Sequence, residues 1–150
     1  MSKMDSIDRQ IIALLGQNAR QSSEEVAKQL NLSSATVRRR IRSLIKRDLL
    51  RIIGVGDPGS FGFSLAVCIA FDVEHDKLES TMAALIKKPE IKWAATTTGR
   101  FDIIVLANFS STDYLSEFLK RDLSNIEGVK DYETLVCLEV AKGRYVQFTS

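Results

Sequence analysis

The spacing of apolar residues changes in the middle of this chain, and that change limits the folds it can adopt. Before residue 50 apolar residues recur every three or four positions, as they do on one face of a helix. After residue 60 they alternate or form short continuous runs, as they do in strands. The segment DPGSFG, residues 57–62, contains turn formers that separate the two patterns. The sequence therefore predicts two domains, residues 1–60 and residues 61–150.

Three helices are predicted in the first domain. Asp5 can cap the first helix, and Ser22 or Ser23 can cap a short second one. After a tight turn at residues 31–33, Ser33 or Ser34 can cap a third helix. The apolar stripe predicted to be buried on the third helix consists of Val37, Ile41, Leu44 and Ile45. The segment LLRIIGVGD, residues 49–57, predicts a hinge strand before the linker, and the first domain is expected to be a winged arrangement of helices.

The third helix concentrates positive charge. Six of the ten residues from Arg38 to Arg47 are Arg or Lys, and no acidic residue follows until Asp48. We therefore predict that these cations face an external partner and do not form local ion pairs. Residues 1–60 carry a net charge of +5, whereas residues 61–150 carry −3. A basic first domain suits a polyanion, and an acidic second domain suits neither nucleic acid nor an anionic membrane.

A short helix, a tight turn and a helix that is apolar on one side and basic on the other form a helix-turn-helix pattern. The second helix of that motif enters the major groove of double-stranded DNA. Short side chains at its start allow a close approach to base edges, and arginines reach guanine or phosphate. The residues predicted to contact DNA are Ser33, Ser34, Thr36, Arg38, Arg39, Arg42 and Lys46.

The second domain predicts a ferredoxin-like fold, so the whole chain is predicted to be an α+β protein. Its elements follow the order βαββαβ, which gives an antiparallel four-stranded sheet with both helices on one face. The first and last strands are neighbours in this topology, so Cys68 and Cys137 are expected on adjacent strands as buried thiols. The predicted elements are residues 64–73, 76–88, 91–98, 102–109, 111–124 and 129–140.

Both faces of the predicted sheet are apolar. In the first strand Leu65, Val67 and Ile69 alternate with small apolar residues and Cys68, and the third strand is similar. The two helices can cover only one face, and an exposed apolar face of several hundred Å² is rare in monomers. A second copy of the same sheet is the simplest cover, and the resulting homodimer would carry two recognition helices.

Several motifs in order resemble the Lrp/AsnC transcriptional regulators, also called feast/famine regulatory proteins. They are Asp8-Arg9-Gln10-Ile11-Ile12 with Leu15 and Asn18-Ala19-Arg20, then Glu25-Val26-Ala27, then residues Leu32 to Ile41, and finally Thr98-Gly99-Arg100-Phe101-Asp102. Each motif alone is weak, but their order and spacing span the whole chain.

The resemblance implies an N-terminal DNA-binding domain and a C-terminal RAM-type domain for effector binding and assembly. Members dimerise through their C-terminal sheets, often form tetramers or octamers, and respond to small effectors, commonly amino acids. The expected effector-binding residues are Thr98, Gly99, Arg100, Phe101, Asp102 and Thr134. An ordinary hairpin connection in which Asp102 binds backbone amides is the alternative for this loop.

Two departures from the family pattern stand out. Family members usually end the recognition helix with Glu-x-x-Gly-Val-Ile, whereas this chain has residues 45–50 as IKRDLL, without the glycine. Arg100 adds a cation where that loop position is often acidic or small. The first departure predicts a different helix exit, and the second predicts a changed effector preference or none.

Other functions were weighed against regulation. Sirohaem decarboxylases resemble this family but need histidines and arginines around a tetrapyrrole, and the single histidine, His75, is expected to be a surface turn residue. An effector sensor that has lost DNA binding, or a protein-binding winged helix, remains an alternative. We predict no enzymatic activity, cofactor or metal. Without a signal peptide or a membrane-spanning apolar run, a cytoplasmic protein is expected.

Overall fold

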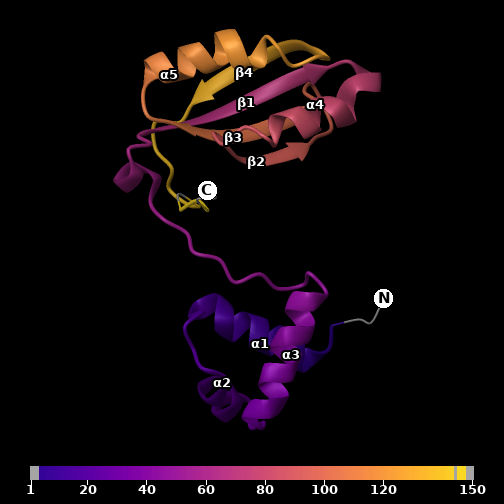
Figure 1. The fold of residues 1–150 in the computed structure, drawn as a ribbon, viewed down its shortest axis with the longest axis vertical. Helices are drawn as coiled ribbons and strands as arrows, with labels where there is room; N and C mark the ends of the chain where they lie inside the picture. The colour runs from indigo at the N-terminus through magenta and orange to yellow at the C-terminus, as the bar shows by residue number, and fades with distance from the viewer. Residues whose placement is uncertain (1–3, 144, 148–150) are drawn as a thin grey trace. The chain divides into compact units, whose positions relative to one another are not determined.

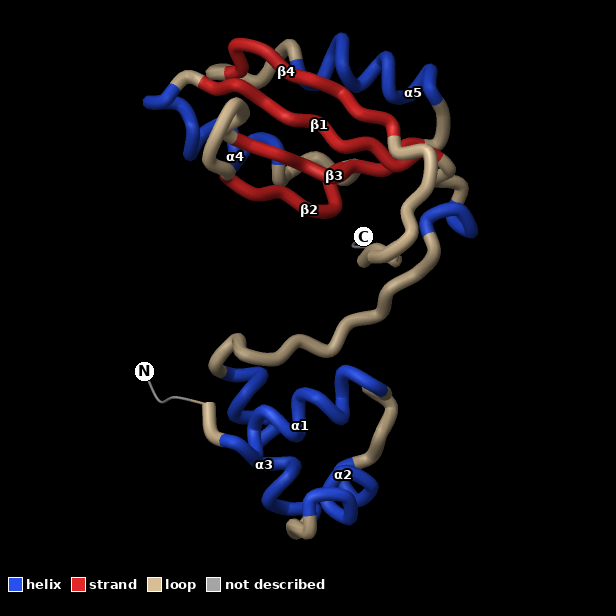
Figure 2. The backbone as a smooth tube through the Cα atoms, turned by 180° about the vertical axis from the view of Figure 1, so that it is seen from behind, coloured by secondary structure: helices blue, strands red, loops and turns tan. Residues whose placement is uncertain are grey.

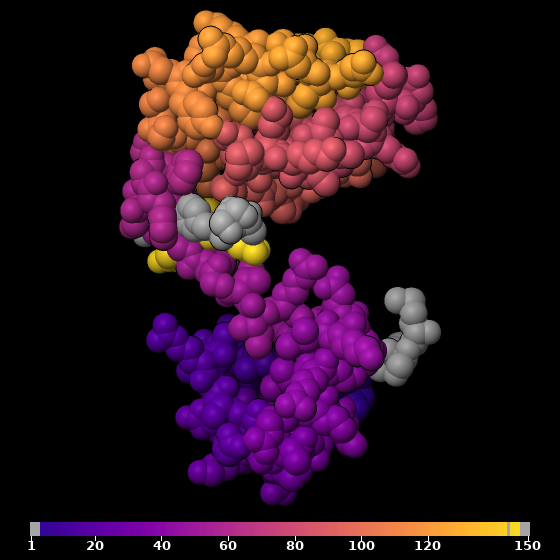
Figure 3. Space-filling model, viewed as in Figure 1, coloured from indigo at the N-terminus to yellow at the C-terminus, as the bar shows by residue number. Residues whose placement is uncertain are grey.

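Two units make up the structure, and each has its own hydrophobic core. The computed structural model describes residues 4–143 and 145–147. The chain divides between Ile53 and Gly54, and the space-filling view shows closely packed side chains within each unit (Figure 3). One buried cluster lies in the helical unit and the other under the sheet. The predicted α+β architecture is confirmed.

The first unit consists of three helices, α1 (Ser6–Gln17), α2 (Ser23–Leu30) and α3 (Ser34–Lys46) (Figure 1). Side chains satisfy the amides at each helix start. Asp5 and Ser22 form capping boxes for α1 and α2, and Ser33 caps α3. These caps confirm the predicted starts and identify which serine acts at each.

Helix α3 buries a narrower stripe than the sequence predicted. Val37 and Leu44 are buried and Ile41 packs against them, but Ile45 is 47% exposed. Ile45 lies about 80° around the helix from Val37, whereas Leu44 lies only about 20° away on the other side. The buried arc therefore extends toward Arg40, and Ile45 falls outside it.

The exit of α3 replaces the expected glycine with Asp48. This residue adopts a left-handed conformation with φ of 54°, which a glycine usually supplies at the end of a helix. The Leu49 amide then donates to the Leu44 carbonyl at 2.9 Å, so the helix still ends in a tight turn. Asp tolerates this conformation better than most residues do.

The predicted strand at residues 49–57 is wrong, and with it the wing. Within the described residues only Gly56 makes a bridge, to Val146. Ile52, Ile53 and Val55 are each about half exposed. Strand propensity alone does not form a strand, because the backbone needs a neighbouring strand to accept its hydrogen bonds, and residues 50–55 have none within the described chain.

The second unit contains the predicted ferredoxin-like sheet, in the order β2-β3-β1-β4 with every pair antiparallel (Figure 2). Helices α4 and α5 pack on one face, where the buried cluster includes Phe71, Phe109 and Phe118. The strands are β1 (Leu65–Val73), β2 (Ile91–Thr96), β3 (Ile103–Phe109) and β4 (Val129–Val136), and the helices are α4 (Leu78–Leu85) and α5 (Thr112–Glu117), with short turns η1 (Pro58–Phe61) and η2 (His75–Lys77).

The second predicted helix of this unit is not uniform. After α5 the chain continues as a π-helical turn, η3 (Phe118–Leu123). Phe118 and Leu123 are both buried although they are five residues apart. An i→i+5 turn brings such residues closer to one side than a regular helix does, which accounts for the change.

Strand β4 ends earlier than predicted, and the cysteines lie near its end. The ladder with β1 ends at Val136 opposite Val67, and the Cys137 amide still donates to the Ala66 carbonyl at 2.9 Å. Cys68 is opposite Leu135, and Cys137 follows the last residue of β4, so the two thiols are diagonal neighbours. Both are free, but they are only partly buried, whereas buried thiols were predicted. Burial, followed by the nearby Cys137, raises the pKa of the Cys68 thiol.

Candidate DNA and effector sites

The outward side of α3 presents cations that pair with nothing in the described chain. Arg39, Arg42 and Lys46 are exposed, and none makes an ion pair with another described residue. They lie about 140–200° around the helix from the buried Val37. Ala35 shares this side, so a small residue precedes the three cations.

The flanks of α3 differ from its outward side, because acidic residues of the other helices neutralise two arginines. Arg38 Nη1 lies 3.5 Å from Glu24 Oε1 on α2. Arg40 Nη1 lies 2.7 Å from Asp5 Oδ2 and 2.8 Å from Asp8 Oδ1 at the start of α1. The prediction that no cation of this run pairs locally is therefore wrong for these two. It failed because the acids are distant in sequence.

The hydroxyl groups at the start of α3 form hydrogen bonds within the helix. Ser33 Oγ accepts a hydrogen bond from the Thr36 amide at 3.1 Å and lies 2.8 Å from Thr36 Oγ1. Arg38 Nη2 donates to Ser34 Oγ at 3.3 Å. All three predicted contact residues lie at the start of α3, and their hydroxyls already have partners.

The pKa of the Asp5 carboxylate at the start of α1 is set by its surroundings. The Asp8 amide, and after it Arg40, hold the pKa of Asp5 below its ordinary value. A lowered pKa in the folded state gives stability that is present above the ordinary pKa and is lost as the pH falls through the lowered value. At neutral pH Asp5 is therefore charged where it contacts Arg40.

The predicted effector loop connects β2 to β3 and has a fixed base. The Thr97 amide donates to the Asp102 carbonyl at 2.8 Å, and Thr97 Oγ1 donates to the Phe101 carbonyl at 2.6 Å. The Asp102 amide donates to the Phe71 carbonyl at 2.8 Å. Thr97 was not predicted, although a threonine beside a glycine turn is a usable signal.

One carboxylate oxygen of Asp102 is already occupied. Oδ2 accepts a hydrogen bond from the Val73 amide at 2.9 Å, which matches the structural alternative for this residue. At the tip of the loop Gly99 has φ of 114°, a conformation that favours glycine. Within the described chain no acceptor receives the amides of Thr98 to Phe101, so the tip remains open to a ligand.

The loop meets β4 through a residue that the sequence did not single out. Arg100 Nη1 lies 3.7 Å from Glu133 Oε2, and the Arg100 guanidinium lies 4.9 Å from the centre of the Phe101 ring. Glu133 is opposite Ala70, whereas Thr134 is opposite Ile69, which is fully buried under the helices. Because directly opposite residues share a face, Thr134 lies on the helix-covered side.

Thr134 therefore does not join the loop residues in this unit. Its hydroxyl oxygen is buried and has no hydrogen-bond partner within the described chain. The structure brings Arg100, Phe101 and Glu133 together on the other side of the sheet. Alternation along a strand places Glu133 and Thr134 on opposite faces of the sheet. Which of them faces the helices depends on the register with β1, and the sequence does not show that register.

The uncovered face of the sheet carries a row of apolar side chains across all four strands. In register, Trp93 is opposite Leu106, Leu106 is opposite Cys68, and Cys68 is opposite Leu135. Trp93, Leu106 and Leu135 are 50%, 45% and 51% exposed. We call these three residues with Cys68 the outer row. Large apolar side chains gathered this way mark an interaction surface.

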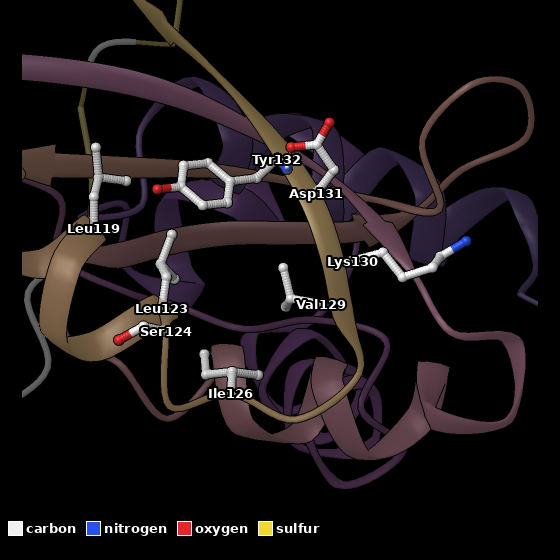
Figure 4. A pocket seen from close by; sticks show the side chains of 8 residues that line it. All are labelled: Leu119, Leu123, Ser124, Ile126, Val129, Lys130, Asp131 and Tyr132. Carbon is white, nitrogen blue, oxygen red and sulfur yellow. Dashed lines mark hydrogen bonds between the residues drawn. The ribbon is translucent and has the colours of Figure 1, made fainter.

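A hollow of about 200 Å³ lies elsewhere, between η3 and β4. Figure 4 shows the Tyr132 ring over the end of η3, while Lys130 points away. Its walls are Leu119, Leu123, Ser124, Ile126, Val129, Lys130, Asp131 and Tyr132. It includes none of the predicted effector residues, and Lys130 Nζ is already 2.6 Å from Asp72 Oδ1.

A helix-turn-helix unit joined to a ferredoxin-like unit with an open loop defines a class of two-domain DNA-binding regulators. Residues 4–45 match the AsnC-type helix-turn-helix domain, and residues 66–147 match the Lrp/AsnC ligand binding domain. An uncharacterised helix-turn-helix-type transcriptional regulator of Pyrococcus horikoshii, PH0140, is 30% identical over 97% of this chain and 92% of its own. The chain belongs to the Lrp/AsnC family of transcriptional regulators.

Solved structures agree with this assignment. The structure of Escherichia coli AsnC has a TM-score of 0.82 at 26% identity, covering 93% of this chain and 95% of that one. The regulator NMB0573 of Neisseria meningitidis, solved as an L-Met complex, has a TM-score of 0.83 at 24% identity, covering 93% of each chain. None of the described helices is long and apolar enough to cross a bilayer.

Proposed function

We propose that this protein reads operator DNA with the outward side of α3 and that two copies joined through their sheets present two such helices. The single observation that supports DNA reading is the set of unpaired cations, Arg39, Arg42 and Lys46, along one side of a capped helix. Arg39 is nearest the start of the helix and is assigned to base edges, whereas Arg42 and Lys46 are assigned to phosphates.

The other residues predicted to contact DNA are still assigned to phosphates, although each already has a partner within the helical unit. Arg38 reaches phosphate by exchanging its exposed partner Glu24, since such surface pairs contribute little. Ser33, Ser34 and Thr36 approach the backbone of DNA from the helix start, where amides and hydroxyls favour an anion. Together they orient the helix, and Arg39 supplies most of the sequence preference.

The outer row supports assembly through the uncovered face of the sheet. Burying Trp93, Leu106 and Leu135 against the same residues of a second copy removes their exposed surface from water. A two-fold symmetric contact uses the same patch on both copies. The resulting homodimer fits a pseudo-palindromic operator, and higher assemblies would build on this dimer.

An amino acid or related small effector is assigned to the loop from Thr98 to Asp102. Support comes from the open amides at the Gly99 turn and the second carboxylate oxygen of Asp102, which suit a carboxylate and an ammonium group. NMB0573, a structural neighbour, was solved with L-Met. Glu133 takes the place on β4 that the sequence assigned to Thr134, because Glu133 contacts Arg100.

We infer a regulatory role without catalysis, with sirohaem chemistry as the alternative. His75 is exposed within η2, and the described residues include no group of three His, Cys, Asp or Glu side chains placed to hold a metal. Mixing the protein with a tetrapyrrole tests the alternative, since a coloured complex would favour the enzyme.

Selection of duplexes from a random pool by the full-length protein, with and without a mixture of amino acids, tests the regulatory proposal. We expect recovered sites with two related half-sites, and a change in occupancy when the effector is present. The log of the affinity should fall linearly with the log of the salt concentration. Failure to enrich any sequence at low salt would contradict DNA reading, and enrichment of a single half-site would contradict the dimer.

A further inference from the structure

Arg40 stands in the middle of the basic run, but its guanidinium points into the helical unit. Nη1 lies 2.7 Å from Asp5 Oδ2 and 2.8 Å from Asp8 Oδ1. The same two carboxylates form the capping box of α1, in which Asp5 Oδ1 accepts the Asp8 amide at 2.8 Å. One nitrogen of α3 therefore contacts both groups that begin α1.

This contact is more enclosed than the other ion pair of α3. The Arg40 and Asp8 side chains are 25% and 10% exposed, whereas Arg38 and Glu24 are 52% and 57% exposed. Removing one partner of an enclosed pair leaves a charge that water does not reach well. The Arg40 contact therefore resists exchange for a phosphate, and the Arg38 contact does not.

The geometry ties the direction of Arg39 to the Arg40 contact. Successive residues are about 100° apart around a helix, so holding Arg40 against α1 fixes how α3 is turned about its own axis. Side chains end about 5–6 Å from that axis, so a turn of about 20° moves them by about 2 Å. A hydrogen bond to a base edge does not survive that displacement.

Arg40 is also held at one place only. Its Nε is buried and has no hydrogen-bond partner within the described chain, so the fork is fixed through Nη1 alone. Val37 and Leu44 anchor α3 by apolar packing, which is not directional. The charged contact supplies the directional restraint that the apolar stripe lacks.

We propose that Arg40 is a positioning residue for DNA reading: it contacts no DNA and, through Asp5 and Asp8, sets the rotation at which α3 presents Arg39 and Arg42. This assignment goes beyond the proposed function and rests on its claim that α3 reads the operator. Arg40 is thereby given a structural role, whereas Arg39 and Arg42, close to it in the sequence, are assigned to DNA contacts.

Full-length Arg40→Met, Asp8→Asn and the double variant test the assignment. Each is titrated with a duplex selected by the unchanged protein and with a scrambled duplex, over a range of salt concentrations. The temperature is chosen so that circular dichroism shows each variant fully folded. Arg40→Lys is added because it keeps the cation and folds even where Met does not, and it should recover part of the affinity.

We expect Arg40→Met to lose about tenfold in affinity for the selected duplex, the size of one well-placed base contact, while affinity for the scrambled duplex changes little. The salt dependence should keep its slope. Asp8→Asn, which removes no positive charge and leaves Asp5 in contact with Arg40, should show a smaller loss of discrimination. The double variant should be no worse than Arg40→Met, since that substitution already removes both contacts.

Arg42→Met is the matched control, because a lost phosphate contact reduces the salt slope by about 0.9. A similar reduction for Arg40→Met would show that Arg40 contacts DNA and would overturn the proposal. Unchanged discrimination in the folded Arg40→Met and Asp8→Asn proteins would also overturn it. If the unchanged protein selects no duplex, DNA reading itself fails, which is a distinguishable result.

Discussion

The helical unit and the sheet unit differ in the kind of side chain that they leave exposed without a partner. In the helical unit five of the six basic residues at 38–47 are divided between internal partners and the outward side of α3, and Val37 and Leu44 are buried. In the sheet unit one face is enclosed by helices, but the outer row remains exposed. The first unit encloses the core between its helices, whereas the second leaves one face of its sheet uncovered.

This difference separates two tasks. Charge without a partner indicates a polyanion, because the attraction falls off slowly and is adjusted by salt. Apolar surface without a partner indicates another apolar surface, because the gain is proportional to the area removed from water. We therefore assign DNA reading to the first unit and propose assembly through the second, and substitutions in each unit should affect mainly one task.

The largest expected effect comes from Leu106→Glu, at the middle of the outer row. A carboxylate there makes burial of the row against a second copy costly, so the dimer should dissociate. Losing simultaneous binding of two half-sites should weaken operator affinity by about a hundredfold. Sedimentation and operator titration measure the two effects.

Ile86→Glu is the control for that substitution. Ile86 is 59% exposed at the end of α4, on the helix side of the sheet, so it gains the same charge away from the outer row. A Leu106→Glu protein that remains dimeric would show that the two units do not divide the tasks as argued.

The next effect is expected from Arg39→Ala, which removes an unpaired cation from the outward side of α3 without disturbing an internal contact. Operator affinity should fall by about 1–3 kcal/mol, and preference at one base position should relax. Sedimentation should still report a dimer. Arg51→Ala is the control, because Arg51 pairs with Asp48 beyond the helix. Retention of the same operator preference by Arg39→Ala would contradict the assignment.

Local signals explain which elements the sequence predicts well. Caps at Asp5 and Ser22 and the change of apolar period depend on neighbouring residues only, so three helices and four strands are found near their expected places. The strand at residues 49–57 is wrong because pairing requires a partner.

The candidate sites were likewise predictable only where they depend on residues close together in the sequence. Arg39 and Gly99 follow from residue type and position in a motif. The Arg40 contact with Asp5 and Asp8 joins residues more than 30 positions apart, so no window of sequence contains it. Glu133 and Thr134 are adjacent, and only the register with β1 tells which one lies on the loop side.

Asp102 sharpens the comparison, because it belongs to the effector loop and also to the sheet. Asp102→Ala should abolish a response to amino acids while leaving operator affinity unchanged. It should also lower the free energy of unfolding by about 1–3 kcal/mol, because the Val73 amide loses its acceptor. Asp102→Asn keeps an oxygen for Val73 and removes only the charge that an ammonium group needs.

Denaturation and effector titration of both Asp102 variants separate the two roles. If Asn preserves the amino-acid response as well as stability, the carboxylate charge does not bind the effector. If Asp102→Ala lowers operator affinity when no effector is present, the loop also takes part in DNA binding, which the proposal assigns to the helical unit.

Glu24→Gln gives the smallest expected effect and tests the boundary between the two kinds of cation on α3. Glu24 and Arg38 form an exposed pair, so the free energy of unfolding should change by less than about 1 kcal/mol. Releasing Arg38 toward phosphate should raise DNA affinity by at most about fivefold, and the gain should disappear in high salt because exposed charges are screened. Glu79→Gln makes the same change in net charge on α4, away from α3. An equal gain from Glu79→Gln would mean that net charge, not the Arg38 contact, governs the effect. Arg40 would then be the one cation of residues 38–47 shown to act through a contact inside the helical unit.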